Sequence, residues 1–164
     1  MKKIIYLIIS IILLINISAC SGYKPIFGSQ NLQFEIADYS IIGNKKIGNQ
    51  IYSKLYGLSN ANKNNPDAQS IHIIIDITKE KKATVKNSAG KTLKYKISLI
   101  SNIIVRDFLT ETEILNYNFS PFSSYEVQDQ YSDTVKLENS TVENLVSQIF
   151  QNLLIKLSEK ISNK

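Results

Sequence analysis

The only cysteine of the chain, Cys20, closes the stretch Ile17-Ser18-Ala19-Cys20 and carries the clearest chemistry in the sequence. Two lysines at positions 2 and 3 precede an apolar run over residues 4–15, which is the layout of a secretory signal peptide. An aliphatic residue, two small residues and then Cys form the cleavage pattern of bacterial lipoproteins. In such proteins the cysteine thiolate is the nucleophile that takes up a diacylglyceryl group as a thioether. The sequence therefore predicts a lipoprotein signal peptide over residues 1–19 and lipidation of Cys20.

The alternative interpretation of this segment is a transmembrane anchor with a buried cysteine near its end. A helix needs ~20 apolar residues to cross ~30 Å of hydrocarbon, and the run over residues 4–15 is shorter than that. We therefore expect the mature chain to begin at Cys20 and to be held in the membrane by acyl chains. Residue 21 is Ser rather than Asp, which by the usual bacterial sorting pattern predicts the periplasmic face of the outer membrane.

Length and cysteine content indicate one domain without disulfides. Removal of residues 1–19 from the 164-residue chain leaves 145 residues, an ordinary size for a single domain. We expect residues 20–31, which contain Gly22, Pro25 and Gly28, to form a lipidated N-terminal tether, and residues 32–164 to form a single α+β domain. Because one cysteine cannot form an intramolecular disulfide, the hydrophobic core must stabilise the fold unaided.

Positive charge is concentrated in one segment. The whole chain has a formal net charge of +5, and the mature part from Cys20 has +3 without the two signal-peptide lysines. Residues 79–96 contain seven lysines and one glutamate, a balance of +6, so the rest of the mature chain sums to −3. Such a basic patch on a mildly acidic body fits anionic lipid, lipopolysaccharide (LPS) phosphates or an acidic protein surface. Export argues against nucleic acid as the partner.

Hydrophobic periodicity predicts the elements that position this segment. A strand over 32–36 is followed by a helix over 47–58, a polar loop over 59–68, and two long alternating stretches over 71–85 and 93–106. A strand over 113–125, a polar segment over 126–139 and a long terminal helix complete the chain. Ser140 and Glu143 have capping-box spacing at the start of that helix, although Asp133 or Thr134 could begin it earlier. One apolar face per element predicts a two-layer α+β fold (β-α-β-β-β-α), with two helices on one face of an antiparallel four-stranded sheet.

The two alternating stretches can place their apolar side chains on one sheet face only if odd-numbered residues pair with odd-numbered residues. This register excludes a four-residue turn at 87–90 and favours three residues, Ser88-Ala89-Gly90, with Gly90 supplying the positive φ of a bulged hairpin. Four lysines then project from the face opposite the core: Lys82, Lys86, Lys94 and Lys96.

Residues that could catalyse a reaction or bind a metal are not grouped in the sequence. The only histidine, His72, is inside a strand, where we expect a structural role. The acids are scattered without metal-ligand spacing, and there is no Gly-rich phosphate loop and no nucleophile elbow. We therefore expect a protein that is not an enzyme and that carries no metal and no cofactor.

The segment Gly22-Tyr23-Lys24-Pro25-Ile26-Phe27-Gly28 resembles the Gly-aromatic-x-Pro-aliphatic-aromatic-Gly sequence that follows the lipidated cysteine in the LPS-assembly lipoprotein family, LptE. The order of elements is similar over essentially the whole chain, although here Ser21 separates Cys20 from the first glycine. The resemblance implies a non-enzymatic lipoprotein that plugs the LPS-transport β-barrel (LptD), helps it to fold and binds LPS. Only Cys20 is carried over from the family, as the lipidation site.

The resemblance implies three partners: an LptD-type barrel, LPS, and outer-membrane lipid reached through the acyl chains. Lys82, Lys86, Lys94 and Lys96 are the candidates for contacts with LPS phosphates. Their alternative role is a solvated sheet face that discourages edge-to-edge aggregation. Two other functions are left open. One is an auxiliary lipoprotein of an ABC or MCE-type lipid-trafficking system, and the other is a cell-wall enzyme, which would need an acid pair or a nucleophile with its base.

Overall fold

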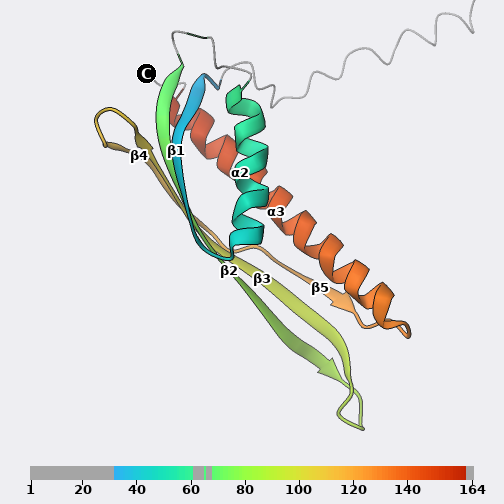
Figure 1. Cartoon of the computed structure of the whole chain (residues 1–164). Coiled ribbons are helices and arrows are strands. Elements are labelled where there is room, and N and C mark those ends of the chain that lie inside the picture. The colour runs from blue at the N-terminus through green and yellow to red at the C-terminus, as the bar shows by residue number, and fades with distance from the viewer. Residues whose placement is uncertain (1–31, 61–64, 66–67, 162–164) are drawn as a thin grey trace, which may run out of the picture.

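Two helices pack on one face of a five-stranded sheet in the computed structural model, which describes residues 32–60, 65 and 68–161 (Figure 1). The elements are β1 (Phe34–Gly43), α2 (Lys45–Asn60), β2 (Gln69–Lys86), β3 (Thr92–Asp107), β4 (Glu113–Phe119), β5 (Phe122–Glu126) and α3 (Tyr131–Ile161). The two-layer α+β class predicted from the sequence is confirmed. The predicted signal peptide, the lipidation site Cys20 and the tether 20–31 lie outside the described residues.

The sheet is mixed rather than wholly antiparallel, which corrects the sequence prediction. Its order is β1-β2-β3-β4, and β1 pairs with β2 in parallel, with Ile36 opposite Ile71 and Ile41 opposite Ile75. The reason is the helix between these strands, because a strand–helix–strand crossover returns the chain in the same direction.

The predicted strand over 113–125 is also two strands, which raises the number from four to five in the described residues. The break lies between Phe119 and Phe122, where Pro121 has no N–H to donate to a ladder. The Leu99 N–H instead donates to the Pro121 carbonyl at 3.0 Å. β4 pairs with residues 101–106 of β3 and β5 with residues 94–98, so the two strands follow each other along the same edge of β3.

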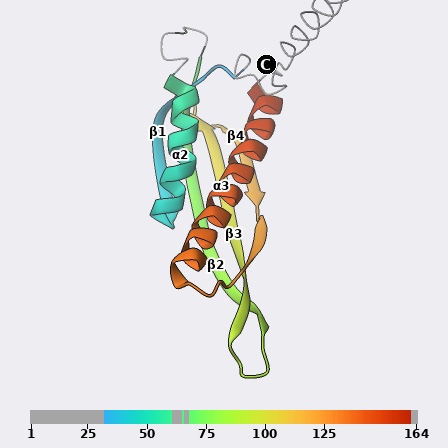
Figure 2. The same cartoon turned by 90° about the vertical axis from the view of Figure 1, so that its right-hand side faces the viewer.

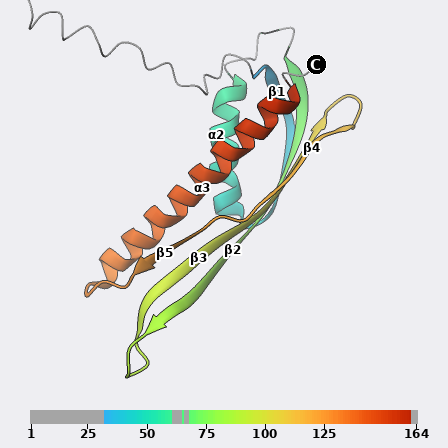
Figure 3. The ribbon, with the colours of Figure 1, turned by 180° about the vertical axis from the view of Figure 1, so that it is seen from behind.

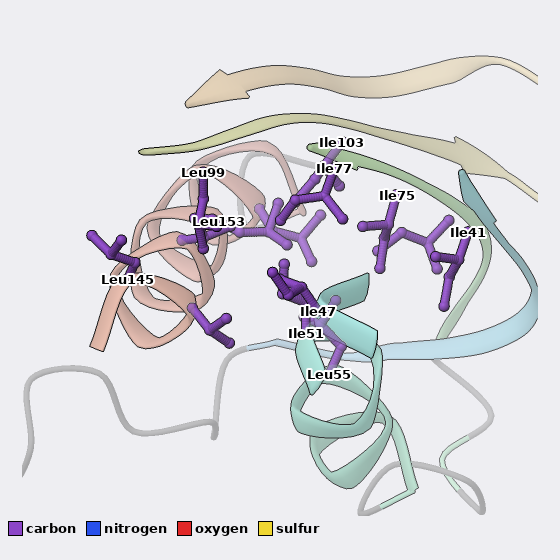
Figure 4. Packing of buried hydrophobic residues seen from close by; sticks show 14 of the residues in the cluster. Ile41, Ile47, Ile51, Leu55, Ile75, Ile77, Leu99, Ile103, Leu145 and Leu153 are labelled. Carbon is purple, nitrogen blue, oxygen red and sulfur yellow. The ribbon is translucent and has the colours of Figure 1, made fainter. Parts of the chain in front are cut away.

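The core lies between the sheet and the two helices, and Figure 4 shows its side chains interleaved. The predicted apolar face of the terminal helix is confirmed, since Leu145, Ile149, Leu153 and Leu157 are fully buried. The predicted face of the first helix is also buried, at Ile47, Ile51 and Leu55. Both helices meet the odd-numbered side chains of β2 and β3, which include Ile73, Ile75, Ile77, Ile97, Leu99 and Ile103.

A glycine allows α2 to approach β1 closely. A Cβ atom built on Gly48 would collide with the Cγ2 atom of Ile41. Gly48 is in the first turn of α2 and Ile41 is near the end of β1, so this contact limits how closely the helix can pack on the edge of the sheet. Gly43, at the end of β1, has a φ of 73°, a left-handed conformation that glycine adopts without strain.

The terminal helix begins earlier than Ser140, at Tyr131, and takes in most of the segment predicted as polar loop over 126–139. Its inward face continues beyond the apolar residues through Thr134 and Thr141, which are buried although polar. The Thr141 hydroxyl donates to the Leu137 carbonyl at 2.7 Å, so its burial leaves no unpaired donor. Figure 2 shows α3 running diagonally across the sheet toward the far ends of β2 and β3.

The ends of β2 and β3 extend past both helices as a projecting hairpin (Figures 1 and 2). The predicted register is confirmed by pairs such as Ile75 with Ile103 and Ala83 with Tyr95. The predicted three-residue turn over 88–90 is confirmed as well. The Asn87 N–H donates to the Lys91 carbonyl at 3.0 Å, Gly90 has a φ of 81°, and the ladder is irregular between Ala83 and Lys86. We call residues 79–96 the basic hairpin.

Candidate functional site

Two of the four candidate lysines, Lys82 and Lys96, are direct neighbours on one face of the basic hairpin. Lys82 is directly opposite Lys96, and Lys86 is opposite Thr92, while Lys94 is opposite Val85 because the bulge displaces the register by one residue. Side chains alternate between faces along a strand. Because Lys94 pairs with Val85, and Val85 and Lys86 are consecutive, Lys86 and Lys94 lie on opposite faces beyond the bulge. Because the odd-numbered Ile97 and Leu99 point into the core, Lys96 and its partner Lys82 lie on the sheet face that neither α2 nor α3 covers. We call this surface the helix-free face.

The close contacts of these lysines leave their charge largely available. Lys82 Nζ lies 3.1 Å from the Glu80 carboxylate, and both side chains are exposed. Lys96 Nζ lies 3.9 Å from the centre of the Phe122 ring, a cation–π contact that preserves the charge. Within the described residues, Lys86 and Lys94 have no ion-pair partner within 4.0 Å. The structure thus brings Lys82 and Lys96 together, whereas the bulge separates Lys86 from Lys94, which corrects the prediction that all four share one face.

Two further lysines of the basic hairpin point the other way and share one acidic partner. Glu138 of α3 lies 2.6 Å from the Nζ of both Lys79 and Lys81. It also accepts a hydrogen bond from the Tyr125 hydroxyl at 2.9 Å. Burial alone would raise the pKa of Glu138, but hydrogen bonds from Lys79, Lys81 and Tyr125 bring it down to about 2. Burial tends to lower the pKa of Lys81, and its hydrogen bonds with Glu138 and Tyr125 outweigh that effect and raise it.

This cluster ties the first turns of α3 to the base of the basic hairpin. Lys81 also lies over the Tyr95 ring, with Nζ 4.4 Å from its centre. The sequence prediction missed Glu138 because it assigned residues 126–139 to a polar loop. A signal for it existed, since Glu138 is four residues before Val142 and seven before Leu145, and so falls in phase with the buried face of the helix.

The helix-free face is neither uniformly polar nor uniformly apolar. Beside the lysines it carries a hydrogen bond between Asn102 and Asn118 across β3 and β4, at 2.8 Å. Ile42, Ile100 and Phe122 are also exposed on it, at 50%, 44% and 63%. A surface of this mixed kind offers hydrogen bonds, apolar contacts and positive charge to a partner or a ligand.

His72 lies in β2, as the sequence predicted, and its Nε2 is 3.8 Å from the Asp38 carboxylate of β1. Among the described residues, no three His, Cys, Asp or Glu side chains are grouped so that they could hold a metal ion. The described helices include none that is both long and apolar enough to cross a membrane.

An open groove of about 560 Å³ separates α2 from α3. Amide and hydroxyl side chains line it together with Lys54 and Glu143. Gln50 borders the groove, and its Oε1 atom is buried without a hydrogen-bond partner. The groove lies between the two helices, on the opposite side of the sheet from the helix-free face.

No family model and no curated protein matches the chain. Among solved structures, a candidate lipoprotein from Caulobacter crescentus CB15 is similar with a TM-score of 0.54 at 10% identity, over 74% of this chain and 88% of that one. At this identity the similarity establishes a shared fold alone. Rare lipoprotein B from Shewanella oneidensis has a TM-score of 0.45 at 14% identity, over 77% of this chain and 94% of that one. A minor lipoprotein from Acinetobacter baumannii has a TM-score of 0.46 at 14% identity, over 72% and 92%.

Proposed function

We propose that the protein is an outer-membrane lipoprotein, lipidated at Cys20 and exposed to the periplasm, that serves as a subunit of the LPS translocon. In this role it plugs an LptD-type β-barrel, assists the assembly of that barrel and binds LPS. The proposal assigns it no enzymatic activity and no cofactor. Its support is the lipoprotein cleavage pattern before Cys20, the resemblance of residues 22–28 to the LptE family, and the fold shared with a candidate lipoprotein.

One observation carries the LPS-binding part of the proposal, namely that Lys82 and Lys96 are direct cross-strand neighbours on an exposed face. Like charges in that position destabilise a sheet, and among the residues that the structure describes only Glu80 lies within ion-pair distance of Lys82. A phosphate group between the two ammonium groups would remove this repulsion and form charge-assisted hydrogen bonds. LPS carries several phosphates, so a second phosphate can engage Lys94 or Lys86, which lie nearer the turn of the basic hairpin.

The plug part of the proposal is supported by the helix-free face. A protein inside the lumen of a transport barrel must present polar groups to a wet, polar wall. Asn102, Asn118, Lys82 and Lys96 supply such groups, while Ile100 and Phe122 can fill apolar recesses of the wall. The end of the basic hairpin extends beyond the helices, so both faces of that end are accessible to the barrel or to LPS (Figure 2).

Co-purification tests this function. The full-length lipoprotein with a C-terminal affinity tag is extracted from its native membranes in mild detergent, and bound proteins are identified by mass spectrometry. A tagged lipoprotein of unrelated fold, with the same signal peptide and tether, serves as the control. We expect an LptD-type barrel in stoichiometric amount. Recovery of an inner-membrane ABC or MCE-type transporter instead would replace the proposal with the lipid-trafficking alternative.

A further inference from the structure

The turn between β3 and β4 presents two consecutive large apolar residues to solvent. Leu109 is 85% exposed and the preceding Phe108 is 46% exposed. Soluble proteins tolerate single exposed apolar side chains, but adjacent large ones at the tip of a turn are typical of contact sites. We call these two residues the apolar tip.

The apolar tip is held in place by one side chain, that of Asp107. Its Oδ1 atom accepts hydrogen bonds from the Leu109 N–H at 3.1 Å and from the Thr110 N–H at 2.9 Å. Its Oδ2 atom accepts a hydrogen bond from Gln69 Nε2 at 2.8 Å. The bond from Gln69, followed by those from the turn, lowers the pKa of Asp107 to about 2, so this acceptor is ionised at neutral pH. The tip is therefore preorganised rather than loose.

The apolar tip lies at the end of the sheet where the described chain begins. The Gln69 N–H donates to the Gln33 carbonyl at 3.0 Å, and the Gln69 side chain donates to Asp107, so these three residues form one row across β1, β2 and β3. Neighbouring strands are about 4.8 Å apart, which places the tip on the order of 10 Å from Gln33. Figure 3 shows this turn and the start of β1 at one end of the molecule, with the basic hairpin at the other.

The length of chain before Gln33 brings this end to the membrane. Gln33 is thirteen steps along the chain from Cys20, and at up to ~3.5 Å each these steps span at most ~45 Å. An acylated Cys20 thus confines the apolar tip to a zone from which it can touch the bilayer surface. The charges around the tip select the lipid. Arg106 is outnumbered by Asp107, Glu111 and Glu113, so an anionic surface would repel this end.

We propose that Phe108 and Leu109 form a second membrane contact, which inserts at the boundary between headgroups and acyl chains of zwitterionic phospholipid next to the anchored Cys20. This contact rests on the proposed lipidation but not on the barrel partnership. Together with the anchor it fixes the orientation of the domain, with the apolar tip at the membrane and the basic hairpin pointing away. Two membrane attachments also hold a protein more stably than one.

The chain contains no tryptophan, so one substitution creates a single fluorescent reporter. Phe108→Trp places it in the apolar tip, and Phe122→Trp places it at another exposed aromatic position, on the helix-free face. Phe122 is opposite Ser98 of β3, ten residues from the tip. The full-length lipidated variants are incorporated into phosphatidylcholine vesicles and separated from unbound protein by flotation. Quenching by brominated phosphatidylcholine and by aqueous iodide is then measured.

We expect the Phe108→Trp reporter to be quenched by the brominated lipid and to be severalfold less accessible to iodide than the Phe122→Trp reporter. Adding Leu109→Ser to Phe108→Trp should restore access to iodide. If the protein floats while both reporters are equally accessible to iodide, the tip contact is wrong and the anchor stands. Equal quenching of both reporters by lipid would also overturn the proposal, because the sheet face would then lie on the membrane. Protein that fails to float would overturn both the tip contact and the lipidation.

Discussion

Glu138 Oε1 and Lys79 Nζ, which come from α3 and β2, lie 2.6 Å apart. The Glu138 side chain is only 19% exposed, and its other oxygen holds Lys81 and the Tyr125 hydroxyl. One carboxylate thus joins α3, β2 and β5 at the base of the basic hairpin. The end of the basic hairpin lies beyond both helices, so this cluster is where α3 supports the base of the hairpin.

Replacement of Glu138 by Gln should therefore weaken the fold. The variant keeps a similar volume but leaves Lys79 and Lys81 without their anionic partner. Hydrogen bonds to charged groups contribute about 1.5–3 kcal/mol each at most, so we expect the free energy of unfolding to fall by about 1–3 kcal/mol. Chemical denaturation at neutral pH measures it. Glu143→Gln, at an exposed position of the same helix, is the control and should change the free energy of unfolding little.

The pH dependence of this difference follows from the pKa of Glu138. The pKa is about 2 in the folded protein, below the ordinary value of 4.5. Because the pKa of Glu138 is lower in the folded than in the unfolded protein, its carboxylate stabilises the fold fully at pH values above the unfolded-state pKa. This stabilisation is lost as the pH falls toward the folded-state pKa. The difference between wild type and Glu138→Gln should thus shrink between pH 4.5 and pH 2. A difference that stays constant over this window would show that the carboxylate is not the cause.

Gly48 and Gly57 offer opposite outcomes for the same change within α2. A methyl group at position 48 would collide with Ile41, whereas at position 57 it meets no atom within 4 Å. We expect Gly48→Ala to cost about 1–3 kcal/mol through overpacking, and Gly57→Ala to stabilise by about 0.5–1 kcal/mol because glycine is unfavourable in a helix interior. Thermal denaturation of both variants compares them. Changes of the same sign would mean that α2 does not pack on β1 as described.

Leu153 tests the packing of α3 on the sheet. It is fully buried in the core, so Leu153→Ala should cost about 2–5 kcal/mol. Lys156 is exposed and paired only with Glu159, at 2.9 Å, and Lys156→Ala should change stability by less than about 1 kcal/mol. Urea denaturation of the two variants measures this difference, and equal effects would contradict the assigned helix face.

Much of the sheet could be predicted from the sequence, because period-two alternation fixes both the face and the register. The turn over 88–90 follows from that register and is confirmed by the pairing of Asn87 with Lys91. The parallel pairing of β1 was missed because alternation gives the face of a strand but not its direction. The start of α3 was missed because Thr134 and Thr141 are polar and yet buried. Hydrophobicity alone therefore placed the first residue of the helix too far along the chain.

The pairing of Lys82 with Lys96 could be predicted for the same reason, since it depends only on register, whereas the bulge beside Val85 makes the predicted common face of Lys86 and Lys94 wrong. The contacts of Lys79 and Lys81 with Glu138 could not be predicted from the sequence pattern. They depend on Glu138, which is distant in sequence and reaches the hairpin only through the diagonal course of α3 across the sheet (Figure 2). Tertiary packing, rather than local pattern, decides which lysines of the basic hairpin have an acidic partner on α3.

Lipidation of Cys20 has a direct mass test. Intact-mass analysis of the membrane-extracted protein should show an N-terminus at Cys20 with the added mass of acyl chains. Each buried methylene contributes ~0.8 kcal/mol, and a single chain binds only marginally, so we expect three chains and stable attachment. A mature N-terminus at any other residue, or the absence of acyl mass, would contradict the lipoprotein assignment.

The central claim is that exposed lysines of the basic hairpin bind the phosphates of LPS. The quadruple variant Lys82→Gln, Lys86→Gln, Lys94→Gln and Lys96→Gln removes this charge. A matched control makes the same change at four exposed lysines elsewhere, Lys46, Lys54, Lys136 and Lys160. Exposed charges contribute only ~0–1 kcal/mol each, so the group is changed together, and LPS binding is titrated at low and high salt.

We predict that the quadruple variant binds LPS severalfold more weakly than wild type at low salt, and that the difference narrows at high salt because ions screen exposed charges. Thermal stability and association with the barrel should be unchanged, and the control should bind LPS nearly as wild type does. Loss of barrel association instead would identify the lysines as a protein interface. Wild-type affinity of the quadruple variant for LPS would contradict the central claim and leave these lysines as a solvated face.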